Sequence, residues 1–330
     1  MSEISVDRPR IPPVAAGEER PLWSVMIPTY NCARYLRATL ASVLAQDPGP
    51  ERMQIEVVDD CSSDHPEAVV RELAPGRVSF FRQPRNVGHT HTFNTCLERA
   101  RGQLVHLLHG DDAVRDGFYR TLERPFAEHP QIGAAFCRYI SMDANGNWET
   151  IAPLEPDGRG ILEGWLERIA LGQRLQPPTI VVRRSVYEAL GGFDHRPGLT
   201  GEDWEMWVRI AAHYPVWYEP EPLALYRVHG SSITAGVSET AQDVVELRRT
   251  IEVNAEVLPP DRAPAIARRA REELAVTAIR RAGRMLDAGR SAAARAQLRE
   301  ALKTSRSPAV LERLAFLGLL ALRRQVKRLL

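Results

Sequence analysis

The sequence predicts an α/β fold: a mixed, mostly parallel sheet flanked by helices, followed by an all-α C-terminal extension. Three features predict it. Short apolar runs alternate with segments of helical spacing over residues 23–108, polar clusters follow the apolar runs, and from residue 239 onward the pattern is helical only. Strands that alternate with helices of this length form right-handed βαβ units. Because ligands bind beyond the carboxyl ends of such strands, the polar clusters are the first candidates for a functional site.

The expected elements alternate most regularly in the first third of the chain. Residues 23–28 are a short apolar run rich in β-forming residues, and residues 33–46 carry apolar side chains at helical spacing. Beyond residue 112 the alternation loosens, and residues 143–147 carry a turn signal. The expected strands are residues 23–28, 54–59, 78–82, 103–108, 132–142, 179–183 and 222–228, and the expected helices are residues 33–46, 66–73, 90–100, 118–128, 161–171 and 204–213.

The chain is expected to have three parts. Residues 1–20 are polar and rich in proline, and they read as a flexible leader. Residues 21–237 form the α/β domain, with a first half at residues 21–115 and a second half at residues 116–237. Residues 238–330 form the helical region. A hydrophobic fraction of 44% and a charged fraction of 26% are ordinary for globular proteins and exclude disorder throughout.

The charge distribution separates the helical region from the rest. Residues 241–330 carry 19 Lys and Arg against 10 Asp and Glu, and the remainder carries 24 against 32, which together give the net charge of +1. An acidic first part suits cation binding, and a basic second part suits an acidic partner or an anionic lipid surface. We expect no nucleic-acid partner.

Cysteine usage and hydropathy indicate the compartment. The four cysteines lack CxxC spacing, which argues against a disulfide framework or a zinc site. The first twenty residues have no apolar core, so we expect no signal peptide. No stretch reaches the roughly 18 apolar residues of a spanning helix. We therefore expect a cytoplasmic enzyme, with a peripheral position at the inner face of the plasma membrane as an alternative. The cysteines are Cys32, Cys61, Cys96 and Cys137.

Polar clusters follow the first two strands. Residues 28–31 (Pro-Thr-Tyr-Asn) place an aromatic in a turn, which suits contact with a nucleobase; the alternative is a plain turn with Asn31 as helix N-cap. Residues 59–60 are both Asp, and adjacent carboxylates repel, so donors or a cation must compensate them. Asp60 could accept from a base or a ribose hydroxyl. Residues 62–64 could cap the next helix.

Residues 109–112 (His-Gly-Asp-Asp) end the fourth strand and are the clearest single motif. Mg²⁺ and Mn²⁺ favour oxygen ligands and often keep one or two carboxylates while diphosphate oxygens complete the shell. A glycine before the aspartates lets the backbone approach a bulky ligand. His89, His91, His106 and His109 together would allow a histidine metal site; satisfied polar histidines or acceptor contacts are the alternatives.

Two later motifs complete the set. Residues 201–204 (Gly-Glu-Asp-Trp) open a helix, where acids either favour the helix dipole or provide a general base toward an acceptor hydroxyl. Residues 226–229 (Tyr-Arg-Val-His) end the last strand, where Arg227 could contact a phosphate and His229 could bind a metal. Each motif alone also has a structural explanation.

In this order the motifs resemble glycosyltransferase family 2, whose members are inverting enzymes with the GT-A fold. The resemblance covers roughly residues 22–235 and does not include the helical tail. The matching runs are residues 24–31 (SVMIPTYN), 42–46 (SVLAQ), 57–60 (VVDD) with 62–64 (SSD), 85–88 (RNVG) with Asn94, 111–112 (DD), 191–194 (GGFD), 202–204 (EDW) and 226–229 (YRVH).

The resemblance implies a role for each motif. Asp112 would bind Mn²⁺ or Mg²⁺, with His229 as a further ligand, and Asp203 would be the catalytic base with Glu202 beside it. The sugar would move, with inversion, from a nucleotide-diphosphate sugar, with UDP- or dTDP-sugars favoured, to a saccharide or lipid-linked acceptor. Cell-envelope or exopolysaccharide synthesis would be the setting. The implied nucleotide-sugar contacts are Pro28, Tyr30, Asp60, Arg85, Asn86, Asp111 and Arg227.

Two positions depart from the family. His109 stands where the metal motif usually has another acid, so we expect Asp112 to anchor the cation and His109 to touch the diphosphate. Cys61 stands where Gly is favoured, which indicates a different turn near the base. Two alternatives stay open: a catalytically silent nucleotide-sugar-binding protein, and a sugar nucleotidyltransferase. The latter normally needs a Gly-rich basic loop, which residues 28–33 lack.

The second half and the tail are harder to interpret. Residues 21–115 would be the nucleotide-sugar half and residues 116–237 the acceptor half, where Trp148 and Trp165 either stack on sugar rings or pack in the core. Residues 282–302 look like one helical hairpin of a tetratricopeptide-type array. The oligomeric state is left open.

The last twenty residues, 311–330, combine an apolar body with basic residues. This composition is typical of a helix on an anionic membrane surface. The alternative is that its leucines pack on the preceding helices. The leucines are Leu314, Leu317 and Leu320, and the basic residues are Arg323, Arg324, Lys327 and Arg328.

Overall fold

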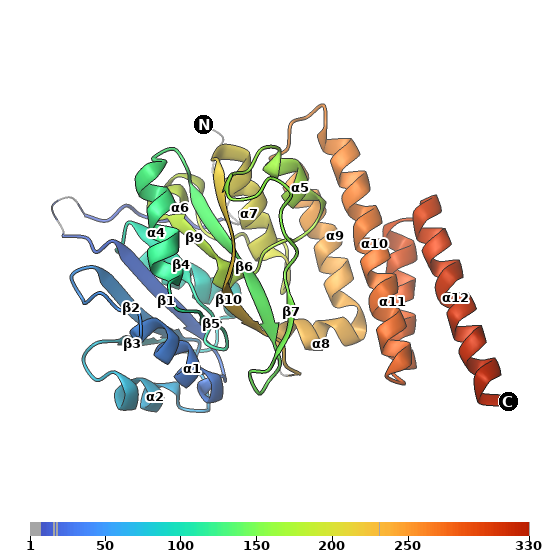
Figure 1. The fold of residues 1–330 in the computed structure, drawn as a ribbon, viewed down its shortest axis with the longest axis horizontal. Helices are drawn as coiled ribbons and strands as arrows, with labels where there is room; N and C mark the ends of the chain where they lie inside the picture. Colours follow the sequence, from blue (N-terminus) through green and yellow to red (C-terminus); the bar gives the residue numbers. More distant parts are fainter. Residues whose placement is uncertain (1–7, 16, 18, 231, 330) are drawn as a thin grey trace. The chain divides into compact units, whose positions relative to one another are not determined.

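The computed structural model describes residues 8–15, 17, 19–230 and 232–329. The chain forms two compact units (Figure 1). The first unit holds the sheet, and the second holds the C-terminal helices. The first consists of Met1–Trp165, Arg174–His195 and Arg209–His229, and the second of Leu166–Gln173, Arg196–Val208 and Gly230–Leu330.

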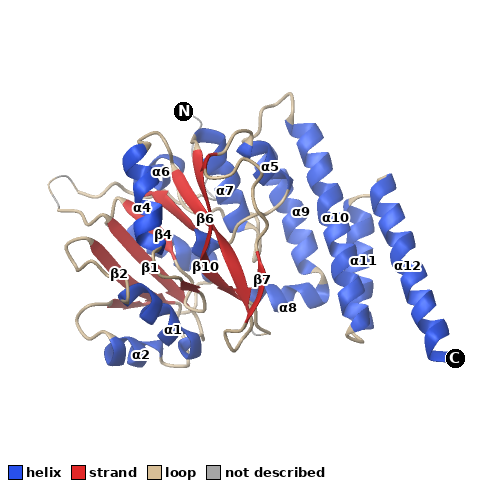
Figure 2. Ribbon diagram, in the orientation of Figure 1, coloured by secondary structure: helices blue, strands red, loops and turns tan. Residues whose placement is uncertain are grey.

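A mixed sheet forms the centre of the first unit, with helices on both faces (Figure 2). The strands are β1 (Trp23–Thr29), β2 (Met53–Asp59), β3 (Ser79–Arg82), β4 (Leu104–Leu107), β5 (Ala113–Val114), β6 (Ala134–Met142), β7 (Trp148–Ile151), β8 (Gly160–Ile161), β9 (Ile180–Arg183) and β10 (Val216–Arg227). Their order is β3-β2-β1-β4-β9-β6-β10-β5, with β7 beside β6 and β8 beside β10. β1 to β4 pair in parallel, as do β6 and β10, and β9 runs antiparallel between β4 and β6. The predicted α/β class with a mostly parallel sheet is confirmed.

The helices follow the predicted alternation and then form the tail. They are α1 (Ala33–Leu44), α2 (Pro66–Leu73), α3 (His89–Arg99), α4 (Phe118–Glu128), α5 (Trp165–Leu171), α6 (Arg184–Leu190), α7 (Glu202–His213), α8 (Ile233–Thr240), α9 (Gln242–Ala255), α10 (Ala263–Asp287), α11 (Ser291–Thr304) and α12 (Pro308–Leu329), with a 3₁₀ turn at Pro177–Thr179. No helix among the described residues is both long enough and apolar enough to cross a bilayer.

The core of the first unit explains why β1 reads as a continuous apolar run. All seven residues of β1 are buried, because helices cover both of its faces. Val25 and Ile27 point to the face where α1, α2 and α4 pack. The alternate residues of β1 face α3, which contacts β1 and β2. Burial on both faces fixes the register of the strands.

This register places the polar loops at one edge of the sheet. Thr29 at the end of β1 lies opposite Asp59 at the end of β2. The N–H of Asp60 donates to Thr29 O at 2.9 Å, and the N–H of Gly110 donates to Pro28 O at 3.0 Å. The loops after β1, β2 and β4 are therefore adjacent, as the rule for parallel sheets predicts.

Several elements differ from the sequence prediction. β10 begins at Val216 rather than at residue 222, and its pairing with β6 shifts register on either side of Pro222. Proline donates no ladder hydrogen bond, so the strand continues through an irregularity that sequence patterning reads as a break. β5, β7 and β8 are too short or too exposed to leave a periodic signal.

Part of the expected leader packs against the first unit instead of being free. Ile11 is 1% exposed. The Arg8 guanidinium donates to the buried Asp194 carboxylate at 2.7 Å, and the N–H of Gly192 donates to Pro9 O at 2.8 Å. The partners of Arg8 and of the Pro9 carbonyl lie more than 180 residues away in the chain, which sequence spacing cannot show.

The second unit is built from small residues. α10 packs on α9, α11 and α12. The core of this unit consists of four alanines and of Val244, Ile279 and Val310. The segment predicted as a hairpin, residues 282–302, covers the end of α10 and most of α11, which pack on each other. Alanine allows close helix approach with little side-chain entropy to lose.

Candidate active site

The loops after β1 and β2 are tied to each other. Asn31 Oδ1 accepts from the N–H of Ser63 at 2.8 Å, and Asp64 accepts from the N–H of Ala33 at 2.8 Å. Asn31 is therefore not the N-cap of α1, a position that Cys32 holds without a side-chain hydrogen bond. Nor does Asp64 cap α2, which His65 precedes without such a bond. The two polar turns form one connected surface at the sheet edge.

Different donors satisfy the adjacent carboxylates of Asp59 and Asp60. Asp59 is fully buried and accepts from the Arg82 guanidinium at 2.9 Å and from Ser62. Asp60 accepts the main-chain N–H groups of Val87 at 2.7 Å and Gly88 at 3.0 Å. These bonds supply the compensation that repulsion between neighbouring acids requires. Asp60 therefore fixes the loop before α3.

Cys61 adopts a left-handed backbone conformation, with a φ of 61°. For a residue with a Cβ atom this conformation costs roughly 1 kcal/mol. Glycine adopts this conformation without that cost. The turn itself therefore has the conformation that a glycine would give it.

The turn between β4 and β5 packs tightly on the loop after β1. A Cβ atom at Gly110 would lie 2.7 Å from Thr29 Oγ1 and 2.9 Å from Cys32 Sγ. The glycine is therefore needed for contact with the protein itself, whereas the sequence interpretation assigned it to ligand approach. Thr39 of α1 donates from its buried hydroxyl to Asp112 O at 2.6 Å. These contacts fix the position of the two aspartates.

Asp111 and Asp112 have opposite electrostatic environments. Burial alone would raise the pKa of Asp111, but a hydrogen bond from His229 and the nearby His109 outweigh it and hold this pKa below its usual range. Burial, and then the charge of Asp111, raises the pKa of Asp112 well above its usual range. Asp112 is 1% exposed, and the N–H of Arg227 donates to its Oδ1 atom at 2.8 Å. Its buried Oδ2 atom accepts no hydrogen bond from any residue that the structure describes.

These residues can hold a metal ion. His109, Asp111 and Asp112 each offer one ligand atom, and these atoms lie within 4.8 Å of one another. A buried carboxylate oxygen without a donor is costly unless a cation or a proton compensates it. The donor set of two carboxylates and an imidazole fits Mn²⁺ or Mg²⁺ with further oxygen ligands. His109, expected to touch the diphosphate and also counted among four histidines that would allow a metal site, thus lies in a position to act as a ligand.

The end of β10 closes this cluster. Nε2 of His229 donates to Asp111 Oδ2 at 2.9 Å, and Nε of Arg227 donates to Asp111 O at 2.7 Å. The centre of the Tyr35 ring lies 4.6 Å from the Arg227 guanidinium and 4.9 Å from the centre of the His229 ring. Tyr35 lies in the helix predicted at residues 33–46. The helical spacing of that segment does not show that the Tyr35 ring meets β10. The predicted residues Asp111, Asp112, Arg227 and His229 are therefore brought together.

The remaining predicted nucleotide contacts lie at the same edge with different exposure. Tyr30 is 52% exposed, and Arg85 and Asn86 are exposed beside the loop that Asp60 fixes. Pro28 is buried within β1, where its carbonyl accepts from Gly110. The roles of these four residues stay predictions.

The predicted base lies in the second unit, at the start of α7. Glu202 and Asp203 are 6% and 7% exposed. Asp203 accepts from the Gln173 side chain at 2.5 Å and from the N–H of Trp204 at 2.7 Å. These bonds fix the orientation of the carboxylate. The roles of Asp203 as catalytic base and of Glu202 beside it stay predictions.

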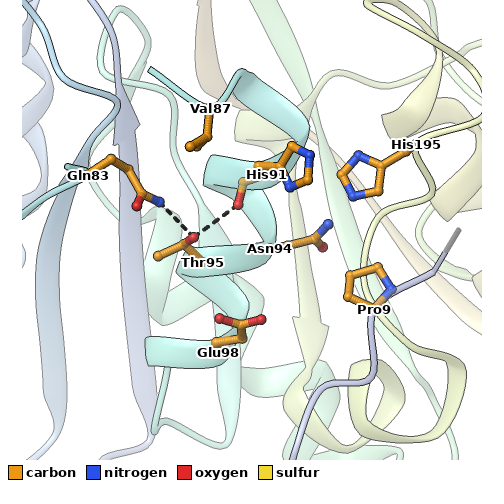
Figure 3. A pocket seen from close by; sticks show the side chains of 8 residues that line it. All are labelled: Pro9, Gln83, Val87, His91, Asn94, Thr95, Glu98 and His195. Atoms are coloured by element: carbon orange, nitrogen blue, oxygen red, sulfur yellow. Dashed lines mark hydrogen bonds between the residues drawn. The ribbon is translucent and has the colours of Figure 1, made fainter. Parts of the chain in front are cut away.

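A cavity of about 360 Å³ lies along α3 (Figure 3). In it, the His91 and His195 rings lie 4.1 Å apart, and Gln83 donates to Thr95 Oγ1 at 2.8 Å. Of the residues that the sequence analysis singled out for metal binding, His91 lines this cavity, whereas the predicted catalytic and nucleotide-sugar residues do not. Val87 joins the cavity to the loop held by Asp60. The lining residues are Pro9, Gln83, Val87, His91, Asn94, Thr95, Glu98 and His195.

Comparisons with known proteins identify the family of the chain. The model of glycosyl transferase family 2 matches residues 24–190. The uncharacterized Mycobacterium tuberculosis protein MT1568 is 30% identical over 259 residues, which cover 72% of this chain and 77% of that protein. The succinoglycan biosynthesis protein ExoO of Rhizobium meliloti is 33% identical over 119 residues, which cover 36% of this chain and 34% of ExoO.

Solved structures share the fold. S. aureus TarS 1–349 in complex with UDP-GlcNAc aligns with a TM-score of 0.59 at 18% identity, covering 74% of this chain and 70% of that one. The Pyrobaculum calidifontis mannosyltransferase PcManGT with GDP-Man and Mn²⁺ aligns with a TM-score of 0.57 at 20% identity, covering 92% and 81%. At these identities the likeness concerns the fold, which is GT-A. With its family match over half of the chain, this protein belongs to glycosyl transferase family 2.

Proposed function

We propose that this glycosyltransferase moves a sugar, with inversion, from a nucleotide-diphosphate sugar to a hydroxyl group of a saccharide or lipid-linked acceptor. UDP- or dTDP-sugars are the favoured donors, and Mn²⁺ or Mg²⁺ is required. The setting is cell-envelope or exopolysaccharide synthesis. Support for the setting comes from the similarity to ExoO, a succinoglycan biosynthesis protein.

One observation supports metal dependence above all others. Asp112 Oδ2 is buried and has no hydrogen-bond donor among the described residues, and it lies beside the carboxylate of Asp111. Two acids this close favour a divalent cation. In the proposal Asp112 anchors the cation, and Asp111, His109 or His229 completes the protein ligands. When bound, the cation stabilises the charge that develops on the diphosphate leaving group.

The protein's own residues then carry out a single displacement. Asp203 accepts the proton of the acceptor hydroxyl while the acceptor oxygen forms its bond to the anomeric carbon. The bond between that carbon and the diphosphate oxygen breaks, and the nucleoside diphosphate leaves with both electrons. Arg227 and Arg85 lie on the nucleotide side, where guanidinium groups bind phosphate oxygens. Tyr30 offers an exposed ring for contact with the base.

Isothermal titration of UDP with and without Mn²⁺ tests the metal step. Wild type should bind UDP more tightly with Mn²⁺. Asp112→Asn keeps an oxygen that can accept from the N–H of Arg227 but removes the charge, and it should lose the Mn²⁺ effect. Asp116→Asn, at an exposed position four residues away, should behave as wild type. An Asp112→Asn protein that retains the full Mn²⁺ effect contradicts the proposal.

A second variant separates transfer from silent binding. Asp203→Asn should abolish the slow hydrolysis of UDP-sugars and leave UDP affinity within about twofold. Asparagine can still accept from the N–H of Trp204 through its one oxygen, and its amide nitrogen can donate to the Gln173 side-chain oxygen once that amide turns over, so the fold of this region should be kept. If wild type binds UDP-sugars but hydrolyses none of them and transfers to no acceptor, the protein is a binding module and the catalytic role of Asp203 is wrong.

A further inference from the structure

Over residues 310–319, the part of helix α12 whose side chains the structure describes, apolar side chains lie on two opposite sides, and one of these sides packs on the core of the helical unit. Val310 is fully buried, and Leu314 and Leu317 pack on the core of the helical unit. A Cβ atom at Gly283 of α10 would lie 3.2 Å from Leu317 Cδ1, so α10 and α12 approach closely there. The predicted packing of Leu314 and Leu317 is confirmed, whereas the Leu320 side chain and those of the basic residues after it lie outside the described residues.

The other side of α12 is exposed. Leu311 is 49%, Phe316 51% and Leu319 61% exposed. Leu311, Ala315 and Leu319 are spaced by four residues and so share one face of the helix, with Phe316 three residues before Leu319. A surface helix normally has one apolar face, turned to the core. Exposed apolar side chains grouped over two turns indicate an interaction site. Glu312, four residues before Phe316, is an exposed acidic residue on this side.

Charge indicates the kind of partner. Residues 306–330 contain six Lys or Arg and one Glu, and residues 241–330 carry a net charge of +9 from 19 basic and 10 acidic residues. The Arg313 guanidinium lies 5.7 Å from the centre of the Phe316 ring, so a cation borders the exposed apolar face. Apolar side chains next to clustered cations are the chemistry that binds anionic lipid surfaces. A protein partner for such a face would need an apolar groove with an acidic border.

We propose that α12 docks this protein on an anionic lipid bilayer through Leu311, Phe316 and Leu319. The apolar side chains enter the headgroup boundary, and Arg313, beside Phe316, contacts a lipid phosphate. Docking on a surface needs no spanning helix. The proposal rests on α12 alone, so its failure would leave the transferase proposal untouched.

Vesicle sedimentation of the full-length protein tests the proposal. Vesicles of 30% phosphatidylglycerol in phosphatidylcholine should bind wild type at least tenfold more strongly than pure phosphatidylcholine vesicles. Binding should weaken when salt rises from 0.1 to 0.5 M, because screening reduces the attraction of the basic residues. The triple variant Leu311→Ser, Phe316→Ser, Leu319→Ser should lose at least tenfold in partitioning.

Controls separate lipid docking from general surface effects. Leu154→Ser removes a side chain that is 60% exposed in the first unit, and it should not change partitioning. Phe316→Trp should keep or increase it, since tryptophan favours the headgroup region. If the triple variant fails to fold, judged by circular dichroism, the single variants Phe316→Glu and Leu319→Glu serve instead.

Three results would overturn the proposal. The first is equal partitioning of the triple variant and wild type, and the second is equal binding of wild type to both kinds of vesicle. The third is a wild-type protein that binds no vesicles and forms a dimer in analytical ultracentrifugation, where the triple variant is a monomer. The last result would assign the face to a second copy of the chain.

Discussion

The main-chain N–H of Arg227 lies 2.8 Å from the Oδ1 atom of Asp112, although the two residues are 115 positions apart in the sequence. This bond joins the end of β10 to the turn after β4. It satisfies one oxygen of a buried carboxylate, and the other oxygen accepts no hydrogen bond from the described residues. In the proposed mechanism, this second oxygen binds the cation.

Replacing Asp112 with Asn should not destabilise the metal-free protein. Burial and the charge of Asp111 disfavour the Asp112 carboxylate, which is why its pKa is raised, so removing the charge relieves an unfavourable interaction. The melting temperature without metal should be equal to or above that of wild type. Mn²⁺ at 100 times its dissociation constant stabilises a binding protein by about 2.7 kcal/mol, and this stabilisation should be missing in the variant. Calorimetry with and without MnCl₂ measures both effects. A variant that melts well below wild type without metal would contradict this account.

Gly110→Ala should destabilise the protein and weaken the metal site. The new methyl group would meet Thr29 Oγ1 and Cys32 Sγ at less than 3 Å, so the turn that carries Asp111 and Asp112 must shift. Overpacking of this kind costs about 1–3 kcal/mol. Gly172→Ala is the matched control, because a Cβ atom there would have no neighbour within 4 Å among the described residues and the backbone φ is not positive. Thermal unfolding of both variants, with and without Mn²⁺, makes the comparison; equal melting temperatures would show that the turn tolerates the methyl group.

Two tryptophans should respond differently to truncation. Trp165 is 4% exposed and stacks on Phe136 with ring centres 5.0 Å apart. Trp165→Ala should cost about 3–5 kcal/mol of the free energy of unfolding, because it leaves a cavity. Trp148 is 59% exposed on β7, and Trp148→Ala should cost no more than about 0.5 kcal/mol. Urea unfolding measures both. Similar losses for the two variants would argue against core packing as the role of Trp165.

His106 should make the protein less stable as the pH falls. Its side chain is fully buried, and burial lowers its pKa from 6.5 to about 3, although a hydrogen bond to Pro178 O opposes the shift. Between these values the unfolded chain binds a proton that the native state does not. The free energy of unfolding therefore falls as pH drops from about 6.5 toward 3, by up to about 1.4 kcal/mol per pH unit from this site.

The variant His106→Asn tests this contribution through the slope of stability against pH. The slope between pH 6.5 and 4.5 should be smaller than in wild type, whatever the loss of stability at pH 7. His65→Asn is the control, because His65 is exposed and has a φ of 58°, a conformation that asparagine tolerates. An unchanged slope in His106→Asn would mean that His106 is not the group responsible.

The sequence determined much of this protein by itself. The alternation of apolar strands and helices predicted the parallel half of the sheet, because periodicity reflects which faces are buried. The aspartates at 59–60 and 111–112 could be placed at one sheet edge, since parallel strands end together. The order of the motifs indicated the family that the comparisons establish.

Only the tertiary structure decided which groups satisfy those aspartates. Asp60 is held by the N–H groups of Val87 and Gly88, Asp111 by His229, and Asp112 by Arg227. Such partners come from distant segments. Because every residue except proline has a main-chain N–H, the residue type does not show which N–H will be the donor. The same holds for the short strands, which depend on pairing with neighbours rather than on their own pattern, and for the second apolar face of α12. Local spacing records burial and turns, whereas contact between distant segments depends on how the whole chain packs.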